Sequence, residues 1–506
     1  MRNKKLIRAI AVVLAVLLVG GVVFSALFSA LSEEQTGVGD SGHSQYALTM
    51  EYLDDEQALH ITQRLVYVNP SDRRLTGVVF YAAGNMFRRE SALMYDDADL
   101  ERVFFDGYAP AGIDLLSVRC DGEPTDFGFQ GEGELYLRAA CDLGPGERCE
   151  FEFEYYLLLA RCGAFQGVGN TDVRLSAFCF IPGVYDEAYG EFNLKRPLPW
   201  TRWLHCDPAD YRVELTLPEG WVPCATGPAE RVGKADGKVL WRMQADGVRD
   251  FALSFGRRWR SVEGTTDSGV RVRVLTNVRG AGRRALKIAI QAIEQCESWF
   301  GPFPMREYTI AQSDYPLGAL NHTGVTWLSS ELMGGKNGDA MAGRLRFCVA
   351  QQYFGLSAYV EPSADAWLSD ALSEYVACLL LEAEEGSDRF LVAVNRDWVS
   401  ALSQTVPGGL RITSDASLFD SYSYDVVVRQ RGAVVLHELR LAMGLDGLLE
   451  GLAGFYRLGR ERDDTLTEMD FVGCLDAATG RSWEAFLTDW LFNVGDYVDQ
   501  NMTWYE

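Results

Sequence analysis

Short runs of alternating apolar and polar residues fill the first half of the chain beyond residue 45. The runs are rich in β-branched and aromatic side chains, and turn-forming segments such as NPSDRR, LGPGER and PEGW separate them. Such alternation places every second side chain on one face of a strand, and frequent turns are typical of antiparallel sheets. We therefore predict an antiparallel β-sandwich or saddle-shaped sheet domain over residues 46–262. Its predicted strands include ALHITQRLVYVN, ELYLRAACDL, CEFEFEYYLLL, DYRVELTLP, KVLWRMQA and FALSFG.

From about Arg279 onward the apolar residues recur with the 3.6-residue period of an amphipathic helix. Gly and Pro residues in the gaps mark where helices begin and end. The pattern predicts a mostly helical domain over residues 263–506, so the expected fold class is α+β with several domains. The predicted helices are Arg284–Phe300, Ala342–Phe354, Ala366–Glu384, Arg429–Met443 and Trp483–Phe492.

The N-terminal segment has the pattern of a membrane anchor. Four basic residues lie within residues 1–8, and residues 9–31 follow as 23 positions without a charge. A helix of that length spans the hydrocarbon layer of a bilayer, and a cleaved signal peptide has a shorter apolar region. The basic flank predicts a cytoplasmic N-terminus with the bulk of the chain outside the cytoplasm. Residues 32–45 are polar and predict a short stalk.

Composition narrows the choice of partners. The 506 residues carry 47 basic and 71 acidic side chains, a net charge of −24 at pH 7. Such a charge repels a phosphate backbone, so we expect no nucleic-acid partner. The apolar fraction of 48% suffices for well-packed cores.

The eleven cysteines include no C-x-x-C pair, which argues against zinc-ribbon or thioredoxin-type chemistry. Cys141 and Cys149 lie on either side of the LGPGER turn, between two predicted strands. They could form a disulfide across that hairpin, or both could be buried free thiols. Both possibilities remain open from the sequence.

Five sequence blocks in the second half occur in a recognisable order. They are WFGPFPMREYTI, GALNHTG, QQYFG, WLSDALSEY and RGAVVLHEL, and they follow the strand-rich segments YVNPSDRRLTGVVFYAAGNMFRRES and DPADYRVELTLPEGW. In this order and spacing the chain resembles the zinc aminopeptidases of the membrane-alanyl-aminopeptidase and leukotriene-hydrolase type, over roughly residues 46–500. The resemblance implies a β domain followed by a thermolysin-like (gluzincin) helical domain, with zinc as the family metal.

The resemblance also implies where zinc ligands would lie. Members carry H-E-x-x-H on a helix and a Glu 19 residues beyond the second His, and the QYFG tail fixes the register here. The first His position is Phe347, the catalytic Glu position is Cys348, the second His position is Gln351, and the third ligand position is Asp370. Phe347 has no donor atom and Gln351 has only an amide, whereas zinc sites need about three nitrogen, sulfur or carboxylate ligands. We therefore expect no bound metal and no zinc-dependent catalysis.

Accessory positions differ from the family as well. Within GALNHTG, Asn321 stands where members have a Glu that grips the substrate's α-amine, and Arg429 stands near the position of a Tyr that steadies the oxyanion. Tyr424, five residues earlier, is a candidate to reach the cleft. The expected cleft-lining residues are Leu320, Asn321, His322, Gln351, Asp370, Glu374 and Tyr424.

These positions lead to one favoured hypothesis and three alternatives. The favoured hypothesis is a pseudopeptidase, anchored in the cell membrane, whose cleft binds a peptide or a partner protein. The first alternative is a metallopeptidase with a rearranged site drawn from His322, Cys348, Asp365 and Asp370, in a chain with only five His residues. The others are a hydrolase with Cys348 as nucleophile and a structural subunit of a membrane complex.

Overall fold

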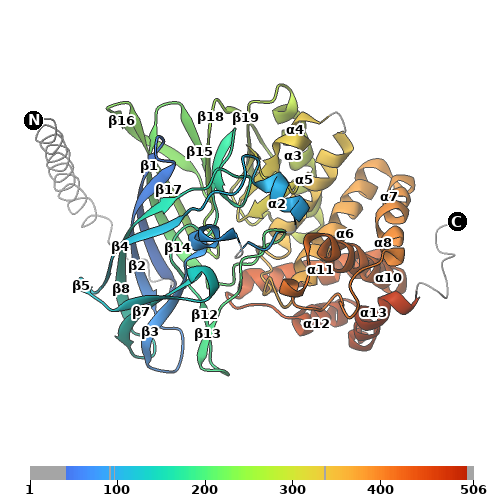
Figure 1. Ribbon diagram of the computed structural model, residues 1–506. Helices are drawn as coiled ribbons and strands as arrows, with labels where there is room; N and C mark the ends of the chain where they lie inside the picture. Colours follow the sequence, from blue (N-terminus) through green and yellow to red (C-terminus); the bar gives the residue numbers. More distant parts are fainter. Residues whose placement is uncertain (1–41, 91–92, 96, 336–337, 498–506) are drawn as a thin grey trace, which may run out of the picture. The chain divides into compact units, whose positions relative to one another are not determined.

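The computed structural model describes residues 42–90, 93–95, 97–335 and 338–497 (Figure 1). Contacts group Ser44–Glu506 into one compact unit, distinct from Met1–His43. The membrane anchor predicted over residues 1–31 lies outside the described residues, as does most of the predicted stalk. None of the helices within the described ranges is long and apolar enough to cross a bilayer.

A large sheet forms most of the first half of the compact unit. Along β1, buried and partly exposed side chains alternate, so one face packs into the core, as the period-two pattern predicted. The sheet is mixed and not purely antiparallel, because β1 pairs with β14 in parallel. In spatial order its strands are β16 (Ala229–Ala235), β17 (Lys238–Val248), β14 (Ala209–Pro218), β1 (Ser44–Leu53), β2 (Ala58–Val68), β8 (Arg148–Leu158), β4 (Gly112–Cys120) and β5 (Glu123–Pro124).

The stalk prediction over residues 32–45 is two residues too long. Ser44 and Gln45 already belong to β1, where they pair with Ala209 and Asp210 of β14. Their polar side chains concealed a strand whose apolar alternation begins only at Tyr46.

Smaller sheets pack against the large one. Aromatic rings fill the space between the layers, with Phe153 of β8 stacked on Phe180 at a ring separation of 4.7 Å. The small sheets are β15 (Trp221–Ala225), β18 (Leu253–Arg257), β10 (Asp172–Leu175) and β9 (Gln166–Val168); β11 (Ile181–Pro182), β3 (Leu75–Tyr81), β7 (Tyr136–Leu143) and β6 (Phe127–Gln130); and the pair β12 (Val184–Asp186) and β13 (Glu191–Asn193). All eleven cysteines are free thiols, Cys141 and Cys149 included.

The helical half opens with a sheet that the sequence pattern did not reveal. Its five strands are, in spatial order, β19 (Arg260–Thr265), β20 (Arg271–Thr276), β21 (Glu307–Ser313), β23 (Val325–Ser329) and β22 (Ala319–His322). The domain boundary predicted at residue 262 falls inside β19, so it cuts a strand. At the edge of this sheet, β22 carries Asn321, which donates a hydrogen bond of 2.7 Å to the Cys348 carbonyl on α5 (Gly338–Tyr353).

Helices predominate in the second half of the compact unit, and α2 lies within the first half (Figure 1). The predicted order, a sheet-rich half followed by a helical half, is confirmed. The helices are α2 (Asp97–Val103), α3 (Ala281–Phe300), α4 (Ser330–Gly334), α5 (Gly338–Tyr353), α6 (Ala366–Glu385), α7 (Ser387–Ala393), α8 (Ser400–Ser403), α9 (Ser421–Tyr424), α10 (Gly432–Met443), α11 (Leu445–Glu461), α12 (Glu468–Thr479) and α13 (Glu484–Tyr497). Short 3₁₀ turns are η1 (Ala83–Arg88), η3 (Glu132–Glu134) and η5 (Ala416–Leu418), and π-helical turns are η4 (Val394–Val399) and η6 (Asp425–Arg431).

Helix α6 lies at the centre of the helical half. Every residue from Ala366 to Ser373 is buried, including Asp370, as expected of a helix covered on all sides. Two glycines allow its neighbours to come close. At Gly355, just after α5, φ is +96° and a Cβ would collide with the Ser369 hydroxyl. At Gly432, where η6 joins α10, a Cβ would lie 2.5 Å from the Cβ of Ala371.

This packing predicts that replacement of two helical glycines by alanine will have different effects on stability. Gly432→Ala should lower the free energy of unfolding by about 1–3 kcal/mol, because the new methyl group overpacks the contact with α6. Gly343→Ala is the matched control. A Cβ there meets no atom within 4 Å, so that change should be neutral or stabilise by up to about 1 kcal/mol. Urea denaturation measures both, and equal effects would contradict the close approach.

Candidate functional site

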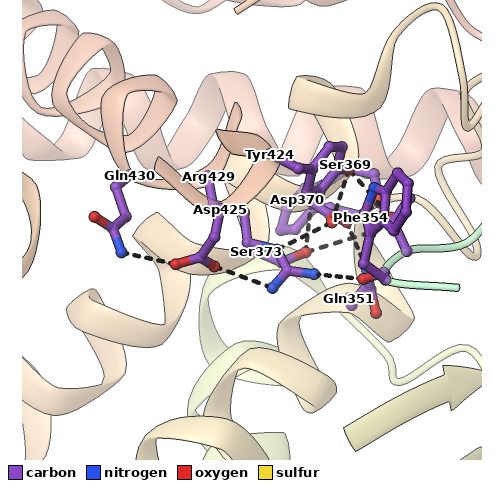
Figure 2. Close-up of polar contacts among 11 residues, drawn as sticks. Gln351, Phe354, Ser369, Asp370, Ser373, Tyr424, Asp425, Arg429 and Gln430 are labelled. Carbon is purple, nitrogen blue, oxygen red and sulfur yellow. Dashed lines mark hydrogen bonds and ion pairs between the residues drawn. The ribbon is translucent and has the colours of Figure 1, made fainter. Parts of the chain in front are cut away.

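Five donors surround the Asp370 carboxylate, which is 1% exposed. Oδ1 accepts hydrogen bonds from Gln351 Nε2 at 2.8 Å and from the adjacent Ser369 hydroxyl at 3.2 Å. Oδ2 accepts from the Tyr424 hydroxyl at 3.0 Å and from Thr201 Oγ1 at 3.2 Å. Arg429 Nε completes the set at 3.2 Å from Oδ2 (Figure 2). Both carboxylate oxygens are therefore fully used as acceptors by side chains of this chain.

Arg429 lies between two carboxylates and two aromatic rings. Its Nη1 lies 3.2 Å from Asp425 Oδ1, one helical turn earlier, and Gln430 Nε2 donates to the same carboxyl group at 2.8 Å. The guanidinium carbon lies 5.2 Å from the Phe347 ring centroid and 5.5 Å from that of Tyr424. These are cation–π distances. Figure 2 shows the chain of contacts from Gln430 through Asp425 and Arg429 to Asp370.

The electrostatics fix the charges of this group. Burial alone would lower the pKa of Arg429, but the carboxylates of Asp370 and Asp425 outweigh it and raise that pKa. Burial, followed by the neighbouring Asp370 charge, raises the pKa of Tyr424 well above its ordinary value, so the phenol keeps its proton and donates it. A buried carboxylate is tolerated when it is paired and hydrogen-bonded, and both conditions are met here.

The residues at the other predicted catalytic positions have structural contacts. Phe347 is 5% exposed, and the guanidinium of Arg344 lies 5.4 Å from its ring centroid. Burial raises the pKa of the Cys348 thiol to about 11, so the thiol is neutral at pH 7 and a poor nucleophile. Asn321 donates to the Cys348 carbonyl and accepts from Thr326 Oγ1, which ties β22 to α5.

Four predicted cleft residues lie outside the Asp370 group, and Asn321, bonded to the Cys348 carbonyl, is one of them. Leu320 and His322, on either side of Asn321, line a separate cavity. The Nδ1 atom of His322 is 2.8 Å from Asp250 Oδ2. Glu374 lies one turn beyond Asp370 on α6; burial and the Asp425 charge raise the pKa of its carboxyl group to about 7.

The residues at the predicted ligand positions do not suit zinc. Phe347 offers no donor, Gln351 turns its amide nitrogen toward Asp370, and both Asp370 oxygens already accept hydrogen bonds. A cationic guanidinium also lies 3.2 Å from the only anionic candidate ligand among these positions. Across the described ranges, no three His, Cys, Asp or Glu side chains are grouped so that they could hold a metal ion. The alternative ligand set of His322, Cys348, Asp365 and Asp370 is therefore not assembled.

The sequence pattern missed what the β half contributes to this group. Thr201 donates to Asp370, and the Trp200 carbonyl accepts from Arg429 Nη2 at 3.4 Å. Both belong to an irregular segment between β13 and β14. Only the proline and tryptophan content of this segment sets it apart in the sequence. A loop has no periodicity from which its contact with the helical half could be predicted.

Asp370→Asn tests the buried ion pair. The change leaves Arg429 with Asp425 as its remaining ionic partner, so we expect the free energy of unfolding to fall by about 3–5 kcal/mol. Asp246→Asn is the control; its carboxylate pairs with Arg212 on the surface, and its loss should cost less than about 1 kcal/mol. Urea denaturation of both variants measures the two changes in the free energy of unfolding. Similar small losses of stability would show that the buried pair contributes little.

Comparison with known proteins identifies the fold. The sequence matches no protein-family model, and no curated protein matches it. Among solved structures, a point mutant of the M1 zinc metallopeptidase from Deinococcus radiodurans is 17% identical, with a TM-score of 0.62 over 89% of this chain and 93% of that one. The same mutant bound to a Tyr-Ser-Ala substrate is 18% identical, with a TM-score of 0.61 over the same shares.

A third structure, a two-domain M1 zinc metallopeptidase mutant bound to L-tryptophan, is 17% identical, with a TM-score of 0.62 over 89% of this chain and 94% of that one. At such identities the likeness concerns the fold alone. The chain has the fold of M1 zinc metallopeptidases, which confirms the architecture implied by the sequence blocks.

Proposed function

We propose that this chain is an aminopeptidase-like protein without zinc-dependent catalysis, whose cleft binds a peptide or a segment of a partner protein. The observation that carries the proposal is the pairing of Asp370 with Arg429. The guanidinium of Arg429, a cation that is part of the chain, neutralises Asp370, the one acidic residue at the predicted ligand positions. A metal ion would have to displace this guanidinium and four other donors.

The chemistry of the side chains supports the loss of hydrolysis. Zinc peptidases lower the pKa of a bound water and polarise the scissile carbonyl with the ion. Here the side chains that would hold the ion offer a phenyl ring, an amide and an already saturated carboxylate. Cys348, at the predicted position of the general base, keeps a neutral thiol at pH 7 because burial raises its pKa. We infer that neither the ion nor the base is replaced.

Retention of the fold supports a binding role. A metallopeptidase of the same fold is described with a Tyr-Ser-Ala substrate, and over 89% of this chain the two folds correspond. We therefore propose peptide or protein segments as ligands. We also propose that residues 1–31 anchor the protein in the cell membrane with residues 46–506 outside the cytoplasm, as the basic flank and the uncharged run of 23 residues suggest.

Metal content and hydrolysis of the purified full-length chain test this proposal. After dialysis against micromolar zinc, we expect far less than one zinc ion per chain by mass spectrometry, and no hydrolysis of alanyl-p-nitroanilide above the buffer rate. A zinc peptidase of the same fold, treated in parallel, is the positive control. One bound zinc per chain, with turnover that a chelator abolishes, would overturn the proposal and favour a rearranged metallopeptidase site.

A further inference from the structure

A cavity between the two halves of the compact unit lies beside the Asp370 group but is distinct from it. The segment around residues 198–204 and the residues after β17 line it from the β half, and β22 and the loop after α5 line it from the helical half. Thr201 belongs to both, since it lines the cavity and donates to Asp370. The polar wall described below is formed by Arg202, Arg249, Asp250, His322 and Tyr359.

His322 lines this cavity and has a buried ring nitrogen without a hydrogen-bond partner among the described residues. The side chain is only 5% exposed, and its Nδ1 lies 2.8 Å from Asp250 Oδ2. Its buried Nε2 has no hydrogen-bond partner within the described residues. Buried polar atoms are normally satisfied, so such an atom in a cavity wall indicates a missing partner. In the imidazolium form both ring nitrogens donate, Nδ1 to Asp250 and Nε2 to a partner in the cavity.

The negative charge of Asp250 is already compensated. Burial would raise its pKa, but hydrogen bonds from His322 and Thr323 and the charges of His322 and Arg202 hold the pKa below its usual range. One oxygen faces His322, and the other accepts from the Thr323 backbone N–H at 3.1 Å and from the Thr323 hydroxyl. Asp250 therefore orients the imidazole and has little capacity left to bind a cation.

Two arginines add positive charge to the same wall. Arg249 is committed: it donates to the carbonyls of Cys206 and Asp463, and its guanidinium carbon lies 4.1 Å from the Tyr359 ring centroid. Arg202 lies 5.8 Å from the same ring, but within the described chain its guanidinium has no hydrogen bond and no ion pair. Arg202, which forms no ion pair within the described residues, and His322, whose Nε2 has no partner, both line the cavity, and such donors bind oxyanions.

The cavity's size selects the kind of anion. The centres of water molecules can occupy about 40 Å³ of its interior, which is enough space for roughly three waters. This is room for a carboxylate group. Leu198, Leu204 and Leu320 give the walls an apolar character, as in sites that bury a short aliphatic segment behind a charged group.

We propose that this cavity binds a carboxylate group, held by Arg202 and by Nε2 of His322, and that the natural source is the free C-terminus of a bound peptide. The proposal rests on the proposed peptide-binding function and specifies its ligand. An ammonium group is disfavoured because Arg202 and Arg249 lie in the same wall. A free small carboxylic acid shares the recognition chemistry, and the experiment distinguishes it from a peptide.

Calorimetric titration of the full-length chain tests the carboxylate site with three probes: acetate, acetyl-trialanine with a free C-terminus, and its C-terminal amide. We expect the free acid to bind at least about tenfold more tightly than the amide, a ratio that corresponds to about 1.4 kcal/mol for one paired charge in a partly enclosed site. Acetate that competes with the peptide identifies a site filled by the carboxylate alone. Failure of acetate to compete identifies a site that also needs the peptide chain.

Variants assign the effect to Arg202. Arg202→Gln should remove the preference for the acid, and Arg202→Lys should keep part of it because the charge remains. Arg260→Gln, on the exposed side of β19, is the matched control and should leave the preference unchanged. Thermal unfolding of each variant checks that the fold is retained. If Arg202→Gln does not fold, a partial loss of the preference for the acid in Arg202→Lys is the deciding result.

Two results would overturn the inference. One is equal affinity for acid and amide, or no binding of any carboxylate probe up to about 10 mM. The other is an undiminished preference for the acid in Arg202→Gln. Equal affinity would leave the proposed peptide cleft standing. Bound zinc with turnover would instead overturn the proposed function, whatever the carboxylate titration shows.

Discussion

The ion pair between Asp370 and Arg429 is the contact on which the centre of the helical half depends. Asp370 lies on α6, a helix with buried residues on all sides, and a carboxylate in that position is costly without a counter-charge. The guanidinium of Arg429 supplies it at 3.2 Å, and hydroxyl and amide donors occupy the remaining acceptor sites. Residues at the predicted zinc-ligand and oxyanion positions thereby hold structural elements of this chain together.

These contacts connect distant parts of the chain. The segment before β14 contributes Thr201, α5 contributes Gln351, and the turns from α9 into η6 contribute Tyr424 and Arg429. The same β-half segment supplies Arg202 to the neighbouring cavity. The two halves therefore meet at a saturated polar cluster and, beside it, at a cavity with unsatisfied donors. That contrast suggests rigidity at the first position and ligand binding at the second.

Much of the architecture was predictable from periodicity. The strand pattern gave the large sheet, and the 3.6 period gave α3, α5, α6 and α10 within a few residues. The five-stranded sheet escaped detection because its central strands β21 and β23 are short and buried on both faces, so they have no alternation of apolar and polar residues. At the site, the spacing of the sequence motifs located Gln351 and Asp370. It did not predict that Arg429 and Thr201 would contact Asp370. Long-range contacts between side chains depend on how the helices and loops pack.

Zinc titration of a ligand-restored chain tests the central claim that Arg429 occupies the place of a cation. The parent variant carries Phe347→His and Gln351→His and keeps Asp370; a second variant adds Arg429→Gln. A guanidinium within a few ångströms of a zinc ion repels it by several kcal/mol, so removal of Arg429 should tighten zinc binding at least about tenfold. Tight, stoichiometric zinc binding that is equal with and without Arg429 would contradict the account.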